Sequence, residues 1–272
     1  MKLLTLTTDF GEREGYPAAM KGVIYGIAPD VQVVDITHQV PPQDLYAAAF
    51  VLEINLFYFP AGSVHVVVVD PGVGTARRPL VGRIGAQYVV APDNGVLTRL
   101  LLRAEREGWP VSLWHADRLE YWRRDVSATF HGRDVFAPLG AHLAAGVPLQ
   151  TLASPIDDPV RLPLEDVQPI ENGVRGQVIY IDHFGNAITN LRAADLAGQA
   201  GMAGQEPLQV RICGRTINGL AHTFGDHPQG ELLALWDSSG YLMVTEYGGL
   251  KQIHARIGEP VDVCYSSLAF PE

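Results

Sequence analysis

The sequence predicts two domains of different class: an α/β domain with a largely parallel central sheet, and a smaller, barrel-like all-β domain. Three observations support this prediction. The first half alternates apolar β-prone runs with segments of helical spacing. A proline-rich stretch follows, and beyond it short β runs are separated by Gly and Asn. We therefore expect an α/β domain over residues 1–155, a linker over 156–172 and an all-β domain over 173–272.

In the α/β domain, strands and helices are expected to alternate. The run Val64–Val69 is apolar apart from one histidine, which is typical of a parallel strand buried on both faces of a sheet. The other expected strands are Leu3–Thr8, Val31–Ile36 and Gln87–Ala91, and the expected helices are Ala18–Ile27, Asp44–Phe57, Gly95–Arg106 and Val135–Ala145.

The prolines at positions 155, 159, 163 and 169 indicate an extended linker, because so many prolines exclude a helix or a central strand. Beyond the linker the only expected helix is Ala193–Ala200. The expected strands are Gly176–Ile181, Pro207–Ile212, Leu232–Trp236, Gly240–Thr245 and Pro260–Tyr265.

Composition excludes several classes of protein. A chain of 272 residues that is 47% hydrophobic can bury a core without disulfides, and its two cysteines exclude a disulfide framework or a Cys-rich zinc site. A net charge of −10 disfavours a nucleic-acid partner. No apolar run approaches the about 20 residues of a membrane helix, and the first ten residues resemble a strand instead of a signal peptide. We therefore expect a cytoplasmic protein without a metal site.

The segment that follows the longest apolar strand is the first candidate site. That strand runs into Asp70, then a Gly-x-Gly turn, then Arg77 and Arg78. Ligands of open α/β sheets bind beyond the carboxyl ends of strands, although Asp70 can instead cap the next element. The segment lacks the Gly-Lys-Ser/Thr ending of a P-loop. It partly resembles the Asp-x-Gly-x-Gly turn of Rossmann-type methyltransferases, which stays an alternative.

Three other segments carry polar groups suited to chemistry. His131 precedes an apolar helical stretch and is a candidate acid or base, or a histidine bonded to nearby backbone. Asp9 ends the first strand, and together with Asp70 it can hold ribose hydroxyls or a cation if the two strands are neighbours. In the β half, Ile181–Asn190 can hydrogen-bond a ligand and stack Phe184 on a base, or simply form a hairpin.

Together, and in this order along nearly the whole chain, these segments resemble the S-adenosylmethionine hydrolases (SAM hydroxide adenosyltransferases), which are relatives of the SAM-dependent fluorinase and chlorinase. No single segment decides this. The matching segments are Thr7–Gly11, Val34–His38, Val69–Thr75, Ala91–Gly95, Phe130–Asp134, Phe184–Asn186 and Ser238–Leu242.

The resemblance implies a homotrimer whose active sites lie between the α/β domain of one subunit and the β domain of the next. It implies S-adenosylmethionine as substrate, no cofactor, and a catalytic set that falls on Asp70, Arg77 and His131. In the halogenases other residues replace this set, so its presence favours water over halide as the nucleophile.

The same resemblance implies a set of substrate-binding residues. Asp9 would bind the ribose hydroxyls, and Glu14 stands where the family usually has Asp. The other implied contacts are Phe184, Asn186 and Phe224 around the adenosine or methionine, Ser238 at the methionine end, and the backbone near Gly248 at the adenine. The halogenases carry Trp at the position of Gln43 and Arg at that of Ser239.

The implied reaction is displacement at C5′ by water, which gives adenosine and L-methionine. Guanidinium cannot act as a base, so we expect Arg77 to stabilise developing hydroxide, and His131 to accept the proton or orient the water. Three alternatives remain: a halogenase of the same superfamily, a methyltransferase that forms S-adenosylhomocysteine, and a sensor that binds S-adenosylmethionine or adenosine without turnover.

Overall fold

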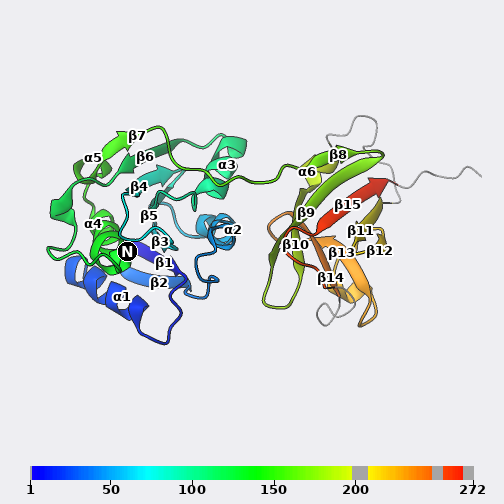
Figure 1. The fold of residues 1–272 in the computed structure, drawn as a ribbon, viewed down its shortest axis with the longest axis horizontal. Coiled ribbons are helices and arrows are strands. Elements are labelled where there is room, and N and C mark those ends of the chain that lie inside the picture. The colour runs from blue at the N-terminus through cyan, green and yellow to red at the C-terminus, as the bar shows by residue number, and fades with distance from the viewer. Residues whose placement is uncertain (1, 198–207, 247–253, 266–272) are drawn as a thin grey trace, which may run out of the picture. The chain divides into compact units, whose positions relative to one another are not determined.

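The computed structural model describes residues 2–197, 208–246 and 254–265, which fall into two compact units, Met1–Pro163 and Leu164–Glu272 (Figure 1). Each unit has a hydrophobic core of its own. The first unit combines helices with a sheet, and the second is built almost entirely of strands. The predicted fold class is confirmed.

A seven-stranded sheet runs through the first unit in the order β2-β1-β3-β5-β4-β6-β7. Strands β2, β1, β3 and β5 are parallel, whereas β4 is antiparallel to both of its neighbours and β7 is antiparallel to β6. The sheet is therefore largely parallel, and β1 lies between β2 and β3, where the winding of the chain reverses direction. The strands are β1 (Leu3–Thr8), β2 (Gln32–Thr37), β3 (Val64–Val68), β4 (Pro79–Ile84), β5 (Gln87–Pro92), β6 (Val111–His115) and β7 (Ser154–Ile156).

Helices cover both faces of this sheet (Figure 1). On one face, Leu4 and Leu6 of β1 share a core with residues of α1 and α4, while α2 and α3 pack together against the other face. None of the helices in the described part of the chain is both long and apolar enough to cross a membrane. The helices are α1 (Tyr16–Ile27), α2 (Leu45–Asn55), η1 (Leu56–Tyr58), α3 (Thr98–Glu107), η2 (Leu119–Tyr121), the π-helical η3 (Gly132–Phe136), α4 (Ala137–Ala145) and α5 (Leu149–Leu152).

Local chemistry sets the ends of these helices. Asp44 caps α2, because its carboxylate accepts the backbone N–H of Ala47 at 2.9 Å. Helices α3 and α4 end at Gly108 and Gly146, whose φ angles of 67° and 98° lie in the left-handed region that glycine adopts without strain. The helix expected to begin at Val135 begins three residues earlier with the π-helical turn η3, directly after His131.

Strands β4 and β6 were not predicted. The reason is visible in β4, which begins with Pro79 and contains Gly82, two residues that weaken a strand pattern. A Cβ at Gly82 would lie 2.4 Å from the side chain of Leu113 on β6, so the glycine is what lets these two strands approach.

The proline-rich stretch differs from the expected linker at both of its ends. Residues 154–156 form β7 and Gln168–Ile170 form β8, each paired on one side only, and an edge strand tolerates a proline such as Pro155 or Pro169. Between them, the backbone N–H groups of Val160 and Leu162 donate to side chains of the first unit at 2.8 Å. This part of the stretch is extended but anchored.

The second unit is an antiparallel sheet in the order β12-β11-β15-β9-β10-β14-β13, with β8 added to β9. Its edge strands β12 and β13 contact each other, which nearly closes the sheet into a barrel. The predicted strand 207–212 and helix 193–200 extend partly outside the described residues. The elements are β8, β9 (Gly173–Ile181), β10 (Ala187–Arg192), α6 (Ala193–Ala197), β11 (Leu208–Ile212), β12 (Arg215–Asn218), η4 (Phe224–Asp226), β13 (Leu232–Trp236), β14 (Tyr241–Glu246) and β15 (Pro260–Tyr265).

Two helical glycines give a matched test of packing in the first unit. A Cβ at Gly140 of α4 would lie 2.3 Å from a methyl group of Val66 on β3, whereas one at Gly22 of α1 meets nothing within 4 Å. We expect Gly140→Ala to lower the free energy of unfolding by about 1–3 kcal/mol, because α4 must move away from the sheet. Gly22→Ala should leave it unchanged or raise it by up to about 1 kcal/mol. Urea denaturation measures both, and equal effects would contradict this account of the packing.

Candidate active site

Two acidic residues meet at the carboxyl edge of the first unit's sheet. Asp9 comes directly after β1, whereas Val69 stands between the end of β3 and Asp70. The two strands are parallel neighbours, with Thr8 opposite Val68. The acids flank a cavity of about 310 Å³ at the position where α/β sheets bind ligands. The cavity is lined by Asp9, Phe10, Tyr16, Pro42, Gln43, Val68, Asp70, Val73, Thr129, Phe130, His131 and Gly132.

Arg77 connects Asp70 to His131. Its Nε donates to both carboxylate oxygens of Asp70 at 2.9 Å, its Nη2 forms an ion pair with the same carboxylate, and Nη2 also donates to Nδ1 of His131 at 2.9 Å. Arg78 turns the other way, to Asp93 and Asp158. The structure thus brings Asp70, Arg77 and His131 together, and it separates the two adjacent arginines.

Arg77 fixes the protonation of His131. A guanidinium only donates hydrogen bonds, so Nδ1 of His131 must accept, and a neutral ring then carries its hydrogen on Nε2. Burial and the positive charge of Arg77 lower the pKa of His131 below its usual 6.5. The imidazole is therefore neutral at neutral pH.

Arg77 is buried next to the other two residues. Asp70 and His131 line the cavity, whereas Arg77 is not among the described residues that do. The side chains of Arg77 and Asp70 are both buried, at 9% and 4% exposed, and the guanidinium lies 4.9 Å from the ring centre of Phe136. Arg77 therefore holds Asp70 and His131, the two groups that line the cavity.

The loop that carries His131 is held by a buried carboxylate. Asp134 is fully buried and accepts hydrogen bonds from the side chains of Arg133 and Arg123 and from the backbone N–H of Ser127. These bonds outweigh burial, which by itself would raise the pKa of Asp134, and lower that pKa to about 2.

The turn that carries Asp70 packs directly against the His131 loop. A Cβ at Gly74, whose φ is 78°, would lie 2.4 Å from the carbonyl oxygen of Ala128. Glycine is required here both for the backbone angle and for the close approach.

Asp9 is held from the other side of the cavity. Its carboxylate accepts the backbone N–H of Gln43 at 2.8 Å, and Gln43 adopts a φ of 63°, which is uncommon for a residue other than glycine. Beside it, Phe10, Tyr16 and Phe130 form edge-to-face contacts with ring centres 5.3–6.0 Å apart. We had not predicted this aromatic wall, although Phe10 and Phe130 belong to the matching segments Thr7–Gly11 and Phe130–Asp134.

The residues expected from the β domain lie in the second unit. Asn186 is buried, and its side chain is used internally: it donates to Asp182 at 2.7 Å and accepts from Thr245. Phe184, in the same turn between β9 and β10, is 74% exposed. The segment thus contains the hairpin that the sequence left as an alternative, with one aromatic ring exposed at its tip.

Two other expected residues lie elsewhere in the second unit. Phe224 is partly exposed in η4. Ser238 is exposed in the turn between β13 and β14, at the opposite end of β14 from Thr245, the partner of Asn186.

The two remaining expected site residues are Glu14 and Gly248. Glu14 is exposed in the turn before α1, and the lining residues that the structure describes do not include it. Gly248 lies outside the described residues.

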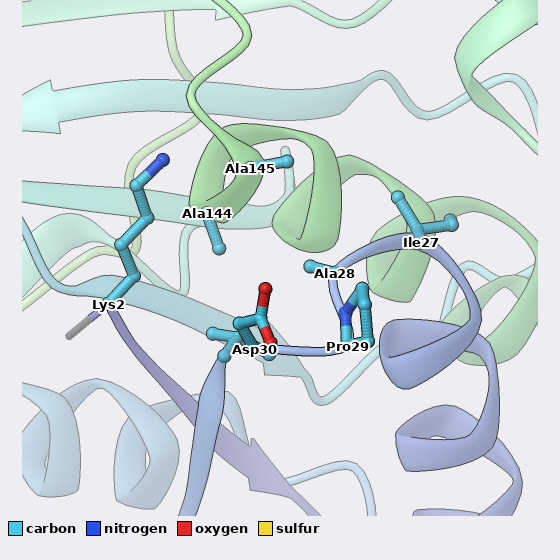
Figure 2. Close-up of a pocket in the computed structure, with 8 residues that line it drawn as sticks. Lys2, Ile27, Ala28, Pro29, Asp30, Ala144 and Ala145 are labelled. Atoms are coloured by element: carbon cyan, nitrogen blue, oxygen red, sulfur yellow. The ribbon is translucent and has the colours of Figure 1, made fainter.

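A larger cavity, of about 400 Å³, lies at the opposite edge of the sheet (Figure 2). It is lined mainly by small apolar residues, with Lys2 and Asp30 as its charged members. Lys2 lies near the carboxyl end of α4, where positive charge stabilises the helix dipole. This explains the lysine without a ligand. Among the residues described, no group of three or more His, Cys, Asp or Glu is placed to hold a metal ion.

Two domain models of one known family match most of the chain. Residues 4–153 match the model of the SAM hydroxide adenosyltransferase N-terminal domain, and residues 176–258 match that of the C-terminal domain. The chain belongs to this family.

Relatives of the chain carry two kinds of name. An (R)-S-adenosyl-L-methionine hydrolase from Salinispora tropica is 41% identical, over 90% of each chain. Another from Thermus thermophilus is 40% identical, over 90% of this chain and 91% of the relative. A fluorinase from Actinoplanes sp. is 29% identical, over 88% and 89% of the two chains. The crystal structure of an uncharacterized conserved protein from Thermotoga maritima is similar, with a TM-score of 0.85, 32% identity, and coverage of 97% of this chain and 100% of the other.

The bonds to Asp134 predict a dependence of stability on pH. Its pKa is lower in the folded protein than the usual 3.8, so the unfolded chain binds more protons between these values and stability rises with pH across them. We expect Asp134→Asn to lower the free energy of unfolding at pH 7 by on the order of 2 kcal/mol. The difference from wild type should shrink as the pH falls from about 4 towards about 2. Urea denaturation across this range measures it, with Asp125→Asn, an exposed change in the same loop, as control. A difference that does not depend on pH would contradict the account.

Proposed function

We propose that the protein hydrolyses S-adenosyl-L-methionine at C5′, giving adenosine and L-methionine. The observation that carries the proposal is the Asp70–Arg77–His131 cluster, which places a carboxylate and a neutral imidazole on a cavity beside Asp9. Membership of the SAM hydroxide adenosyltransferase family, and relatives of about 40% identity that are named hydrolases, support it.

The chemistry required of the protein is modest. The sulfonium is a cationic leaving group that departs neutral as methionine, so no acid has to protonate it. As the bond between water and C5′ forms, the water oxygen gains positive charge and its protons become strongly acidic. A carboxylate in contact with that water is then basic enough to accept one. The protein must mainly hold one water in line with C5′ and exclude others.

Asp70 and His131 are the groups that we assign to the water. Asp70 accepts the proton, because the Nδ1 lone pair of His131 is already used by Arg77. The Nε2–H of His131 orients the water by donating to its oxygen. Arg77 is a positioning residue, which orients the carboxylate and selects the tautomer of the ring. The proton leaves Asp70 for solvent after methionine has departed.

The same proposal covers the rest of the ligand. Asp9, fixed by the N–H of Gln43, binds the ribose hydroxyls. Phe184, Phe224 and Ser238 are exposed and available to the adenosine or methionine, whereas Asn186 supports the turn that presents Phe184.

The proposal also includes the assembly and the compartment of the protein. The homotrimer is proposed from the family resemblance alone. The free thiols of Cys213 and Cys264 are consistent with a reducing compartment such as the cytoplasm. S-adenosylmethionine enters as substrate, and the reaction as written uses no cofactor.

The test is incubation of the purified protein with S-adenosylmethionine in ¹⁸O-labelled, halide-free water, followed by mass spectrometry. We expect adenosine labelled at its 5′ oxygen together with free methionine. A product that forms only when halide is added would indicate a halogenase. Intact substrate that stays bound would indicate a sensor, and either result would overturn the proposal.

The roles of the cluster are tested by Arg77→Ala and His131→Ala. We expect each to lower kcat by at least about a hundredfold, because the water loses either its oriented carboxylate or its hydrogen-bond donor. Binding of S-adenosylmethionine, measured by calorimetry, should change far less. Arg83→Ala removes an exposed arginine of β4 and serves as the charge control. Full turnover in either cluster variant would remove that residue from the mechanism.

A further inference from the structure

The Val34–His38 segment takes no part in the proposed mechanism, yet it places a buried histidine next to the cavity loop. His38 follows β2 and is 4% exposed. Its Nδ1 lies 2.9 Å from the hydroxyl oxygen of Thr8, the last residue of β1. The residue after Thr8 is Asp9, to which we assign the ribose.

A chain of charged groups supports this histidine from outside. Its Nε2 lies 3.1 Å from Oδ1 of Asp35, in a close contact that is bent away from ideal hydrogen-bond geometry. Oδ2 of Asp35 is bonded to the ammonium of Lys21 on α1 at 2.5 Å. The carboxylate of Asp35 and the ammonium of Lys21 are partly exposed, whereas the ring of His38 is buried. The ion pair therefore lies between the buried imidazole and the surface of the unit.

The carboxylate of Asp35 sets the hydrogen-bond directions in this chain, and Thr8 can match them. Its hydroxyl oxygen accepts the backbone N–H of Phe10 at 3.2 Å, and its single hydrogen is then free to donate to Nδ1 of a neutral His38. The remaining ring hydrogen is on Nε2 and faces Asp35. A reversed tautomer would direct a lone pair at the carboxylate.

His38 holds the same loop through its backbone as well. Its carbonyl oxygen accepts the N–H of Gly11 at 2.8 Å. The ring and the carbonyl together fix residues 8–11 as they turn past the end of β1. Two of these residues, Asp9 and Phe10, line the cavity.

We infer that His38 is a positioning residue for the substrate: through the hydroxyl of Thr8 it sets the loop that presents Asp9 and Phe10. This rests on the proposed function and extends it, because it assigns the Asp35–His38 pair to binding of the adenosine part. The groups assigned to the displacement, Asp70 and His131, come from β3 and from a different loop. Loss of His38 should therefore weaken binding more than it slows the chemical step.

The fold contains a matched control. His65 on β3 is also buried, and its Nδ1 lies 2.7 Å from the hydroxyl of Thr5, on the same strand as Thr8. This second Thr–His pair is not part of the cavity lining that the structure describes. Replacing either histidine removes the same kind of bond from β1, but only His38 supports the loop.

The experiment compares His38→Ala, His38→Asn and His65→Ala. For His38→Ala we expect KM for S-adenosylmethionine and Kd for adenosine to rise together by at least about fivefold, with kcat changed by less than about threefold. His38→Asn keeps a hydrogen-bonding atom near the position of Nδ1 and should restore most of the binding. His65→Ala should lower Tm but leave KM unchanged.

Two further measurements test the inference: the first does not depend on turnover, and the second changes Thr8, the hydrogen-bond partner of His38. Amide hydrogen exchange at residues 8–11 of the ligand-free protein should be faster in His38→Ala than in His65→Ala. Thr8→Val should reproduce the binding loss, and adding it to His38→Ala should cost little more, because both changes remove the same bond. Unaltered exchange, a fall in kcat alone, or a rise in KM that His65→Ala matches would overturn the inference. If the two histidine variants differ in exchange as expected but the wild-type protein does not hydrolyse S-adenosylmethionine, the result contradicts the proposed function instead.

Discussion

The parallel pairing of β1 with β3 is the constraint on which the candidate site depends. Both strands are buried, and their register places the residues after Thr8 and Val68 side by side at one edge of the sheet. Two carboxylates, Asp9 and Asp70, therefore flank one cavity although 61 positions separate them in the sequence. The winding of the chain reverses at β1, so no crossover helix lies above this edge, and loops are free to line the cavity.

Asp9, Asp70 and His131, which line the cavity, each accept a hydrogen bond from a second residue. Arg77 holds both Asp70 and His131, and it is itself enclosed by the ring of Phe136. Asp134 holds the loop of His131, and the N–H of Gln43 holds Asp9. A buried guanidinium with an adjacent carboxylate and imidazole has few ways to rearrange, because any other arrangement leaves a charge without a partner in a low-dielectric interior. This rigidity suits a reaction in which the protein mainly has to align one water.

Much of the fold could be predicted, because the hydrophobic pattern that specifies a helix or a strand is local. The run over β3 and the spacing in α2 indicated their elements correctly. Two of the missed strands, β4 and β10, lie where glycine, proline or polar motif residues interrupt that pattern, and pairing with neighbouring strands decides their conformation. The proline-rich stretch is extended as expected, but the side chains of Arg78 and Asp93 that anchor it lie far away in the sequence.

The sequence by itself determined the class of both units, the acids at the ends of β1 and β3, and the family to which the motifs belong. Only the tertiary structure decided what each side chain contacts. It directs Arg77 to Asp70 and His131 while the adjacent Arg78 points elsewhere, and it places Asn186 in an internal hydrogen-bond network. The physical reason is that a charged or amide group takes whatever partner burial brings within about 3 Å, and those partners come from strands and loops that are distant along the chain.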